Sequence, residues 1–331
     1  MALPPGSLPP ARHARDDTHP LRERGNTAEI GMARFDPGQP ADLEASLLGG
    51  QAHRWKREGG WYSGVLRGEL VLIRRNGQAI EFLSSPSAPQ AIIPRVRDHL
   101  RLDDDLLSIQ AEISGDANVA SQVGRYPGLR VLRQDPWECL IAYICSANSN
   151  IETIHRNMER LSDEFGVALT IDHPALTAEG KTNIRRNTFP KAVDLAEAGE
   201  AELRRLKLGF RAPYVHRAAI AVAEKRLDID RLVTAPYPEA KAELMALKGI
   251  GNKIADCIAL MSLEKLQAFP IDVWVRRALA DWYFPGQKVP ANPALLAWAQ
   301  GYFGRYAGYA NQYLFHGRRL RDRKPAQSES S

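Results

Sequence analysis

The sequence contains little cysteine and no long apolar run. Its 331 residues include three cysteines, Cys139, Cys145 and Cys257, and no two of them form a Cys-x-x-Cys pair. A structural zinc ion or an iron–sulfur cluster is typically held by about four such ligands, so we predict no metal site and expect reduced thiols. No stretch approaches the ~18 apolar residues of a membrane-spanning helix, and the first residues lack the apolar segment of a signal peptide. We therefore expect no membrane contact.

The composition predicts folded domains and leaves the partner open. Apolar residues make up 44% of the chain, and a chain of this length typically forms two or three compact units. The net charge of +5 favours a polyanionic partner, although many proteins without one share that balance. No coiled-coil or docking pattern is visible, so we expect a monomer.

Both ends of the chain differ from its body. Residues 1–32 are rich in proline, arginine, histidine and aspartate and show no periodicity, which predicts a disordered tail. Met32 is an alternative start of the protein. Residues 318–331 contain a run of basic residues, and we predict a second disordered tail there.

Strand signals dominate residues 33–125. The segments "WYSGVL", "ELVLIRR" and "QAIEFL" indicate an antiparallel meander, and Asn76-Gly77 predicts a two-residue hairpin turn. A helix from about Pro94 to Ile113 should cover one face of the sheet. We therefore expect a β-rich N-terminal domain.

Helical signals dominate residues 126–317. Asp135-Pro136-Trp137-Glu138 resembles a capping box with proline at the first helical position, and the apolar run "CLIAYIC" behind it predicts a buried helix. Ile151, Ile154 and Met158 begin a helical spacing that continues to Phe165. The predicted fold class is α+β, with a β-rich N-terminal domain followed by a larger all-α domain.

Residues 238–263 predict two helices joined by the turn "KGIGN". Gly249 and Gly251 have no side chains, so a phosphate group can approach the backbone N–H groups where the second helix begins. Such phosphate binding reads no base and is independent of DNA sequence. An ordinary helical hairpin with a glycine turn explains the same pattern.

Lys253 and Asp272 stand at the predicted starts of two helices. Partial burial near the positive end of a helix favours a neutral amine, and a neutral amine is a nucleophile. Asp272 is a good N-cap, and a carboxylate near an amine also moves protons and stabilises positive charge. Asp256 is a rival carboxylate that we interpret as a surface or structural group. A neutral amine, a carboxylate and a phosphate-binding turn together suggest chemistry at a sugar C1′ in nucleic acid.

Seven segments resemble one protein family in the right order, and together they span residues 40–316. The sequence is similar to the helix-hairpin-helix DNA glycosylase superfamily and, within it, to 8-oxoguanine DNA glycosylase of eukaryotic type, whose N-terminal domain is TBP-like. The segments are "GGQAHRW", "WYSGVL", "LRLDDDLLSI", "VLRQDPWECLIAYICSANSNI", "LGFRAPYV", "LKGIGNKIADCIALMSLEKLQAFPIDVWV" and "YAGYANQYLF".

The resemblance implies a bifunctional DNA glycosylase and lyase. Lys253 matches the nucleophile that attacks C1′, expels the damaged base and forms a Schiff base, and Asp272 matches the aspartate that assists it. Gly50 matches a glycine whose carbonyl accepts the N7–H that 8-oxoguanine has and guanine lacks. Phe315 and Cys257 match residues on the two faces of the flipped base.

The resemblance also implies how DNA is held. Asn148 and Arg211 match residues that hold the orphaned cytosine, and Phe210 matches an aromatic wedge beside it. The expected partner is double-stranded DNA containing 8-oxoguanine, in the bacterial cytoplasm and nucleoid or in the eukaryotic nucleus. No cofactor is required, and a monovalent cation on the hairpin carbonyls is compatible with the pattern.

The chain departs from the family pattern at three positions. Thr153 stands where an arginine reads cytosine, which predicts relaxed discrimination of the opposite base. Asn311 replaces a glutamine that reads the edge of the damaged base, with Gln312 beside it, and its side chain is one methylene shorter. Trp274 replaces a phosphate-binding histidine and has a single N–H to donate.

Two other functions fit parts of the pattern. A monofunctional alkylpurine glycosylase of the same superfamily has the aspartate but lacks a nucleophilic lysine, so Lys253 argues against it. A non-catalytic helix-hairpin-helix module that binds DNA needs neither Asp272 nor the N-terminal "GGQAHRW" segment.

Overall fold

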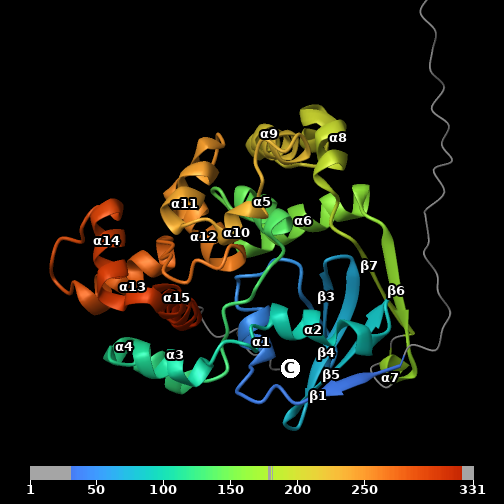
Figure 1. Cartoon of the computed structure of the whole chain (residues 1–331), viewed down its shortest axis with the longest axis horizontal. Helices are drawn as coiled ribbons and strands as arrows, with labels where there is room; N and C mark the ends of the chain where they lie inside the picture. The colour runs from blue at the N-terminus through green and yellow to red at the C-terminus, as the bar shows by residue number, and fades with distance from the viewer. Residues whose placement is uncertain (1–30, 178–179, 181, 323–331) are drawn as a thin grey trace, which may run out of the picture.

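The computed structural model describes residues 31–177, 180 and 182–322 (Figure 1). Residues 1–30 of the tail predicted at 1–32, and residues 323–331 of the tail predicted at 318–331, lie outside the described residues. The N-terminal part is built on a five-stranded antiparallel sheet with the strand order β1-β5-β4-β3-β2. Its strands are β1 (Ala33–Phe35), β2 (Lys56–Glu58), β3 (Trp61–Leu66), β4 (Glu69–Asn76) and β5 (Ala79–Ser85).

The predicted meander of β3, β4 and β5 is confirmed, with a shift at one turn. Asn76 pairs with Ala79, so the two turn residues are Gly77 and Gln78, one position later than Asn76-Gly77. Gly77 has a φ of +59°, a conformation that glycine adopts without strain. Asn76 stays in the ladder and donates to Glu81 at 2.7 Å.

Helices cover one face of the sheet. Four helices belong to the N-terminal part, namely α1 (Leu43–Leu47), α2 (Pro89–His99), α3 (Leu106–Ile113) and α4 (Ala117–Arg125). The buried side chains of Val71, Ile73 and Phe82 pack there with Ile92 and Val96 of α2. Burial on this face explains the apolar positions of β4 and β5.

The single helix predicted from Pro94 to Ile113 is wrong, because α2 and α3 are separate. The chain turns at Arg101, which has a φ of +48°, and the Arg101 guanidinium pairs with Glu264 at 2.8 and 2.9 Å. Asp105 then begins α3 by accepting a hydrogen bond from the Ser108 backbone N–H.

A second sheet covers the other face, and the sequence did not predict it. β6 (Ala168–Asp172) and β7 (Asn183–Asn187) form a two-stranded antiparallel sheet within the helical part. Leu169 and Ile171 of β6 pack with Leu70 and Leu72 of β4, and Figure 1 shows both strands beside the N-terminal sheet. The C-terminal part is therefore mainly helical rather than all-α.

The remaining helices form the C-terminal part and pack around a large cluster of buried apolar side chains. They are α5 (Pro136–Cys145), α6 (Ile151–Phe165), α7 (Pro174–Thr177), α8 (Ala192–Arg205), α9 (Ala212–Ala223), α10 (Arg231–Thr234), α11 (Tyr237–Ala246), α12 (Asn252–Ser262), α13 (Val273–Tyr283), α14 (Asn292–Phe303) and α15 (Ala307–Asp322), with short 3₁₀ turns η1 (Gly209–Arg211) and η2 (Gly304–Tyr306). The predicted cap of α5 is confirmed, because Asp135 accepts from the Glu138 N–H at 3.0 Å.

None of the described helices is both long and apolar enough to cross a bilayer.

The C-terminal tail begins later than predicted. α15 continues through Asp322, so residues 318–322 are helical rather than disordered. Arg318 pairs with Asp281 of α13 at 2.8 Å, and Arg319 is buried with its guanidinium carbon 5.8 Å from the centre of the Phe315 ring. These contacts between α15 and its surroundings explain why a basic sequence remains ordered there.

Buried polar groups fix the segment that follows α1 against the helical part. Gln51 donates to the Arg130 carbonyl at 2.7 Å and accepts from the Leu132 N–H at 2.8 Å. Arg54 and Arg186 both bond Glu159 of α6, at 3.1 and 3.0 Å. The "GGQAHRW" segment is thus held in place beside α5 and α6.

Candidate active site

A cleft of about 1230 Å³ opens between the two parts of the chain. Five stretches of chain line it, at residues 50–53, 143–154, 251–261, 270–276 and 311–319, with a further contribution from 292–296. They include the start of α12, the start of α13 and one face of α15. Lys253 and Asp272 therefore face the same cavity, as the sequence predicted.

Lys253 is the second residue of α12 and lies over α5. Its Nζ donates to the Ser146 hydroxyl at 3.3 Å and lies 5.8 Å from the centre of the Tyr143 ring. An aromatic face attracts a cation, and the attraction is larger where water is excluded. The amine is therefore held in position by a hydroxyl and a ring.

Asp272 is the N-cap of α13, as predicted. Its Oδ1 accepts from the Val275 N–H at 2.8 Å. Burial raises the pKa of Asp272, while the Val275 N–H and the positive charge of Lys253 act in the opposite direction. No ion pair joins Asp272 to Lys253 within the described residues. Their opposite charges therefore interact through the cleft without direct contact.

Gly50 and Phe315 border the same part of the cleft. Gly50 has a φ of +93°, and a β-carbon there would lie 2.7 Å from Cδ1 of Ile151 and 3.4 Å from Cε1 of Phe315. Glycine is thus required both by the backbone conformation and by the space. The result is a narrow slot with a backbone wall on one side and an aromatic ring on another.

Cys257 and Asn311 line the cleft as buried groups. Cys257 lies one turn after Lys253 in α12, and burial raises the pKa of its thiol to about 12. The thiol therefore stays protonated and is a poor nucleophile. The Asn311 side-chain amide donates to the Pro270 carbonyl at 2.9 Å, which fixes its orientation in the wall.

Asn148, Phe210 and Arg211 meet at the rim. Asn148 is exposed with a φ of +47°, and the Arg211 guanidinium donates to the carbonyls of Ala147 at 2.9 Å and Asn148 at 3.0 Å. Its central carbon lies 4.4 Å from the centre of the Phe210 ring, which is 47% exposed. Arg211 thus fixes the Asn148 turn and an exposed ring, and it does not line the cleft.

The two hairpin glycines have different surroundings. Gly249 has a φ of +101°, and a β-carbon there would lie 2.5 Å from the Tyr214 ring. Gly251 is the N-cap of α12, and no described atom lies within 4 Å of a β-carbon placed on it. Gly249 is therefore needed to close the turn, whereas Gly251 leaves open space before the first N–H groups of α12.

The structure also locates the residues at which the sequence departs from the expected pattern. Thr153 accepts a hydrogen bond from Arg156 at 3.1 Å but is absent from the cleft lining. Trp274 does line the cleft, with the guanidinium carbon of Arg277 5.2 Å from its ring centre. Gln312 is buried beside Asn311, and its amide nitrogen has no hydrogen-bond partner among the described residues.

Asp256 lines the cleft, but its carboxylate is already engaged by two side chains of α11. It is buried and pairs with Lys241 at 2.8 Å, and the Tyr237 hydroxyl donates to it at 2.6 Å. Asp256 thereby clamps α11 to α12. Sequence reasoning missed Tyr143, which it grouped with an apolar helix, and Ser146, which directly follows that helix. Their spacing of three residues places them on one face.

The fold and the cleft define the class of protein: the chain is a helix-hairpin-helix DNA glycosylase. Residues 36–140 match the family model described as "8-oxoguanine DNA glycosylase, N-terminal domain". Residues 141–295 match the model described as "HhH-GPD superfamily base excision DNA repair protein". The chain belongs to the 8-oxoguanine DNA glycosylase family.

Relatives and solved structures agree with this assignment. The chain is 31% identical to the N-glycosylase/DNA lyase OGG1 of Arabidopsis thaliana over 80% of this chain and 74% of that protein. It is 31% identical to a probable N-glycosylase/DNA lyase of Methanothermobacter thermautotrophicus over 62% of this chain and 68% of that protein. It is similar to the 8-oxoguanine glycosylase/lyase of Clostridium acetobutylicum bound to double-stranded DNA with cytosine opposite 8-oxoG, with a TM-score of 0.78, 27% identity, and coverage of 86% of this chain and 93% of that one.

Proposed function

We propose that this protein removes 8-oxoguanine from double-stranded DNA and then nicks the strand through a lysine Schiff base. One observation carries the proposal. Lys253 and Asp272 stand at the starts of α12 and α13 and line one cleft, whose further wall holds Gly50 and Phe315. These positions support Lys253 as the nucleophile and Asp272 as its acidic partner, with a slot for a planar base in the same cleft.

The reaction follows from these positions. A paired base is stacked and its C1′ is shielded, so the nucleotide first leaves the duplex. The neutral Lys253 amine attacks C1′, the bond from C1′ to the base breaks, and the base leaves with that electron pair. Asp272 stabilises the positive charge that develops on the sugar. Ring opening gives the Schiff base, loss of a C2′ proton gives an enamine, and the 3′ phosphate leaves by β-elimination.

The slot beside Gly50 distinguishes the damaged base from guanine. The Gly50 carbonyl accepts a hydrogen bond from the N7–H of 8-oxoguanine, whereas N7 of guanine presents a lone pair that repels the carbonyl oxygen. A buried polar group left without its partner discriminates strongly against the wrong base. Phe315 and Cys257 contact the two faces of the base, and Asn311 contacts its edge.

The remaining surfaces hold the duplex. The N–H groups after Gly251 bind a phosphate, while Asn148, Phe210 and Arg211 occupy the gap and the opposite base. The protein works as a monomer where the cell keeps its DNA and requires no cofactor. The carbonyls of the turn between α11 and α12 are the groups that a monovalent cation would bind.

Borohydride trapping tests this function. The protein is incubated with a duplex containing 8-oxoguanine, borohydride is added, and the mixture is separated on a denaturing gel. We expect a covalent protein–DNA adduct that Lys253→Gln abolishes, while Lys288→Gln, which changes an exposed lysine, retains it.

Other outcomes identify the alternatives. Release of the base without an adduct would indicate a monofunctional glycosylase. Binding with neither adduct nor release would indicate a DNA-binding module without catalysis.

A further inference from the structure

Tyr143 of α5 contacts both parts of the cleft that the proposed reaction uses. Its side chain is 5% exposed and belongs to the cleft lining. Its ring supports Lys253, and its hydroxyl group bonds the segment that directly follows Gly50. A residue with these two contacts can set the distance between the nucleophile and the slot for the base.

The ring and the backbone of Tyr143 hold the amine. Nζ of Lys253 lies 5.8 Å from the centre of the Tyr143 ring and donates to the Ser146 hydroxyl at 3.3 Å. The Ser146 hydroxyl in turn donates its one proton to the Tyr143 carbonyl at 2.7 Å. Because that proton is already used, Ser146 can only accept from Lys253. The lone pair of a neutral amine therefore stays free for attack.

The hydroxyl group of Tyr143 holds the segment beside the slot. It donates to the Gln51 carbonyl at 3.2 Å. Burial raises the pKa of Tyr143 well above its usual value, so the hydroxyl keeps its proton and remains a donor. The same carbonyl accepts from the Gln134 side-chain amide at 2.9 Å. Since Gln51 directly follows Gly50, these bonds restrict movement of the Gly50 backbone.

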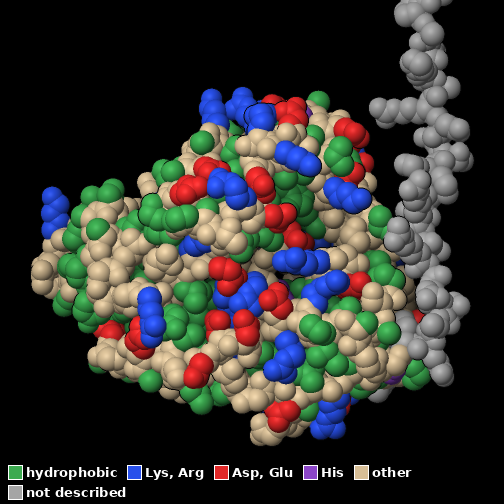
Figure 2. All heavy atoms as spheres, viewed as in Figure 1, with side chains coloured by type: hydrophobic (Ala, Val, Ile, Leu, Met, Phe, Trp, Pro, Cys, Tyr) green, Lys and Arg blue, Asp and Glu red, His purple; other side chains and the backbone are tan. Residues whose placement is uncertain are grey.

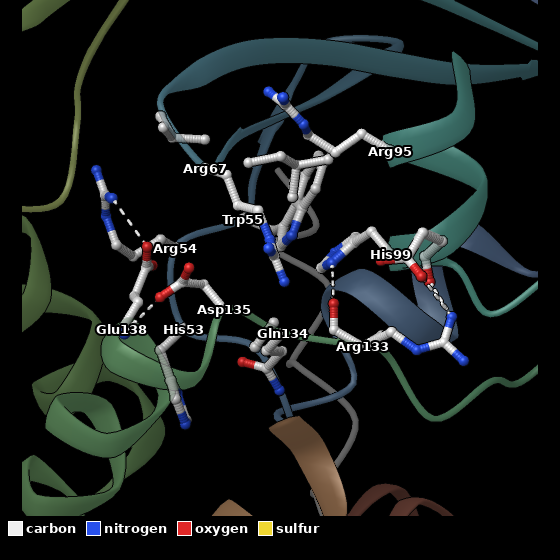
Figure 3. Close-up of a pocket in the computed structure, with 14 residues that line it drawn as sticks. His53, Arg54, Trp55, Arg67, Arg95, His99, Arg133, Gln134, Asp135 and Glu138 are labelled. Carbon is white, nitrogen blue, oxygen red and sulfur yellow. Dashed lines mark hydrogen bonds and ion pairs between the residues drawn. The ribbon is translucent and has the colours of Figure 1, made fainter. Parts of the chain in front are cut away.

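His53 packs on the same tyrosine. The centres of the two rings lie 5.7 Å apart with their planes at 77°, a T-shaped arrangement that is favourable for aromatic rings. Figure 3 shows the His53 ring pointing away from the carboxylate of Glu138 in the neighbouring pocket. One hydrogen bond and one ring contact therefore join residues 51–53 to Tyr143.

We propose that Tyr143 is a positioning residue that holds the slot for the damaged base in register with the nucleophile. The inference rests on the proposed function of Lys253 and Gly50. Tyr143 locates the amine by its ring and, through Ser146, by its carbonyl, while its hydroxyl locates the wall of the slot. A base in the slot then presents C1′ at the distance that attack requires, and a displacement of about 1 Å costs on the order of 100-fold in rate.

Phenylalanine at this position would supply only part of the role. It would keep the ring beside Lys253 and the packing of His53, but it would lose the bond to the Gln51 carbonyl. That carbonyl would retain the Gln134 amide as its partner, so no buried acceptor is left unpaired and the variant should fold. Tyr143→Phe therefore separates the hydroxyl from the ring.

The test compares two single-turnover reactions in the unmodified protein and in Tyr143→Phe. Release of 8-oxoguanine from a duplex needs both the slot and the nucleophile, whereas borohydride trapping at a preformed abasic site needs the nucleophile alone. We expect Tyr143→Phe to slow base release about tenfold more than it slows trapping. Ser146→Ala should instead slow both reactions by similar factors, because Ser146 contacts the amine and not the slot.

A double variant tests whether Tyr143 acts through Gly50. Gly50→Ala closes the slot by itself, so adding Tyr143→Phe should slow base release by no more than about a further twofold. Substitutions that act on one structural element are expected to be non-additive in this way.

Tyr309→Phe is the matched control. Tyr309 of α15 is also buried and donates its hydroxyl to Asp104 at 2.7 Å, but it is not part of the cleft lining. This variant should leave the ratio of the two rates unchanged. Binding of each variant to a duplex with an uncleavable abasic analogue separates loss of positioning from loss of folding.

Two results would overturn the role of Tyr143 while leaving the proposed function intact. One is a Tyr143→Phe variant that binds DNA and changes base release and trapping by the same factor. The other is a double variant in which the losses from Gly50→Ala and Tyr143→Phe multiply in full. If the unmodified protein neither releases 8-oxoguanine nor forms the adduct, the proposed function itself fails.

Discussion

Gly50 and Phe315 face each other across the slot, so close that a β-carbon on Gly50 would lie 3.4 Å from Cε1 of the ring. The two residues are far apart in sequence and come from opposite ends of the described chain. The slot therefore exists only when the N-terminal segment and α15 are both in place.

A Gly50→Ala substitution should close the slot. The methyl group would collide with Ile151 at 2.7 Å, and displacing a bound base by about 1 Å costs on the order of 100-fold in rate. We expect base release to fall by about that factor, while cleavage at a preformed abasic site falls much less. Gly68→Ala is the control, since Gly68 also has a positive φ, of +86°, but faces open space. Equal losses at both kinds of site would contradict the assignment of Gly50 to base recognition.

Asp272→Asn should separate catalysis from helix capping. Asparagine caps a helix about as well as aspartate, so α13 should remain intact while the negative charge is lost. We expect single-turnover base release to fall at least 100-fold, at the scale of other electrostatic groups in active sites, with binding to the lesion retained. Asp272→Ala should in addition lower stability by about 1 kcal/mol. Loss of lesion binding in the asparagine variant would show that the residue is only a cap.

The buried cluster around Glu159 should make the fold sensitive to acid. Burial alone would raise the pKa of Glu159, but Arg186, Arg54 and Lys56 lower it to about 2. A carboxyl whose folded pKa is depressed stabilises the protein above its ordinary pKa, and that stability is lost as the pH falls from about 4.5 through about 2. We expect Glu159→Gln to lower the free energy of unfolding by about 3 kcal/mol at pH 7 and to flatten this acid-dependent loss.

Chemical denaturation across the pH range measures the effect of Glu159. Glu44→Gln is the control, because Glu44 and its partner Arg57 are both mainly exposed and such pairs contribute little. An acid dependence unchanged in Glu159→Gln would assign the loss to other groups.

Binding of undamaged duplex should depend on salt and on Gly251. Contacts with phosphates release counterions, so affinity should fall steeply with added salt. Gly251→Asp places a negative charge before α12 without disturbing its cap, and we expect at least a tenfold weaker binding at low salt, with a smaller difference at high salt. Gly251→Asn is the uncharged control and should bind nearly as the unmodified protein does. Fluorescence anisotropy measures both, and salt-independent binding would rule out the phosphate contact.

Local signals in the sequence predicted the local features of the site. The cap formed by Asp272 and the turn around Gly249 depend on a few neighbouring residues, so both could be read from the chain. The resemblance placed Lys253 and Gly50 in one site, and the structure brings them to one cleft. Their convergence depends on contacts that no local pattern contains.

The sequence did not predict the elements that depend on contacts with residues far away along the chain. β6 and β7 are held by packing against β4, and the break after α2 depends on Arg101 pairing with Glu264, far along the chain. The sequence also contained no sign that His53, one residue of "GGQAHRW", lines the cleft. Acidic and basic side chains are interspersed on the face in Figure 2, so the net charge alone did not locate a binding surface.

The β6–β7 sheet has a consequence for chimeric proteins. Because it covers the outer face of the N-terminal sheet, a graft that exchanges residues 33–125 between relatives would leave Trp61 and Leu83 against foreign side chains. A successful graft must therefore also transfer residues 168–187 from the same donor. The unit that can be exchanged consists of two separate stretches of sequence, because the β6–β7 sheet belongs structurally with the N-terminal sheet but lies within the helical part of the chain.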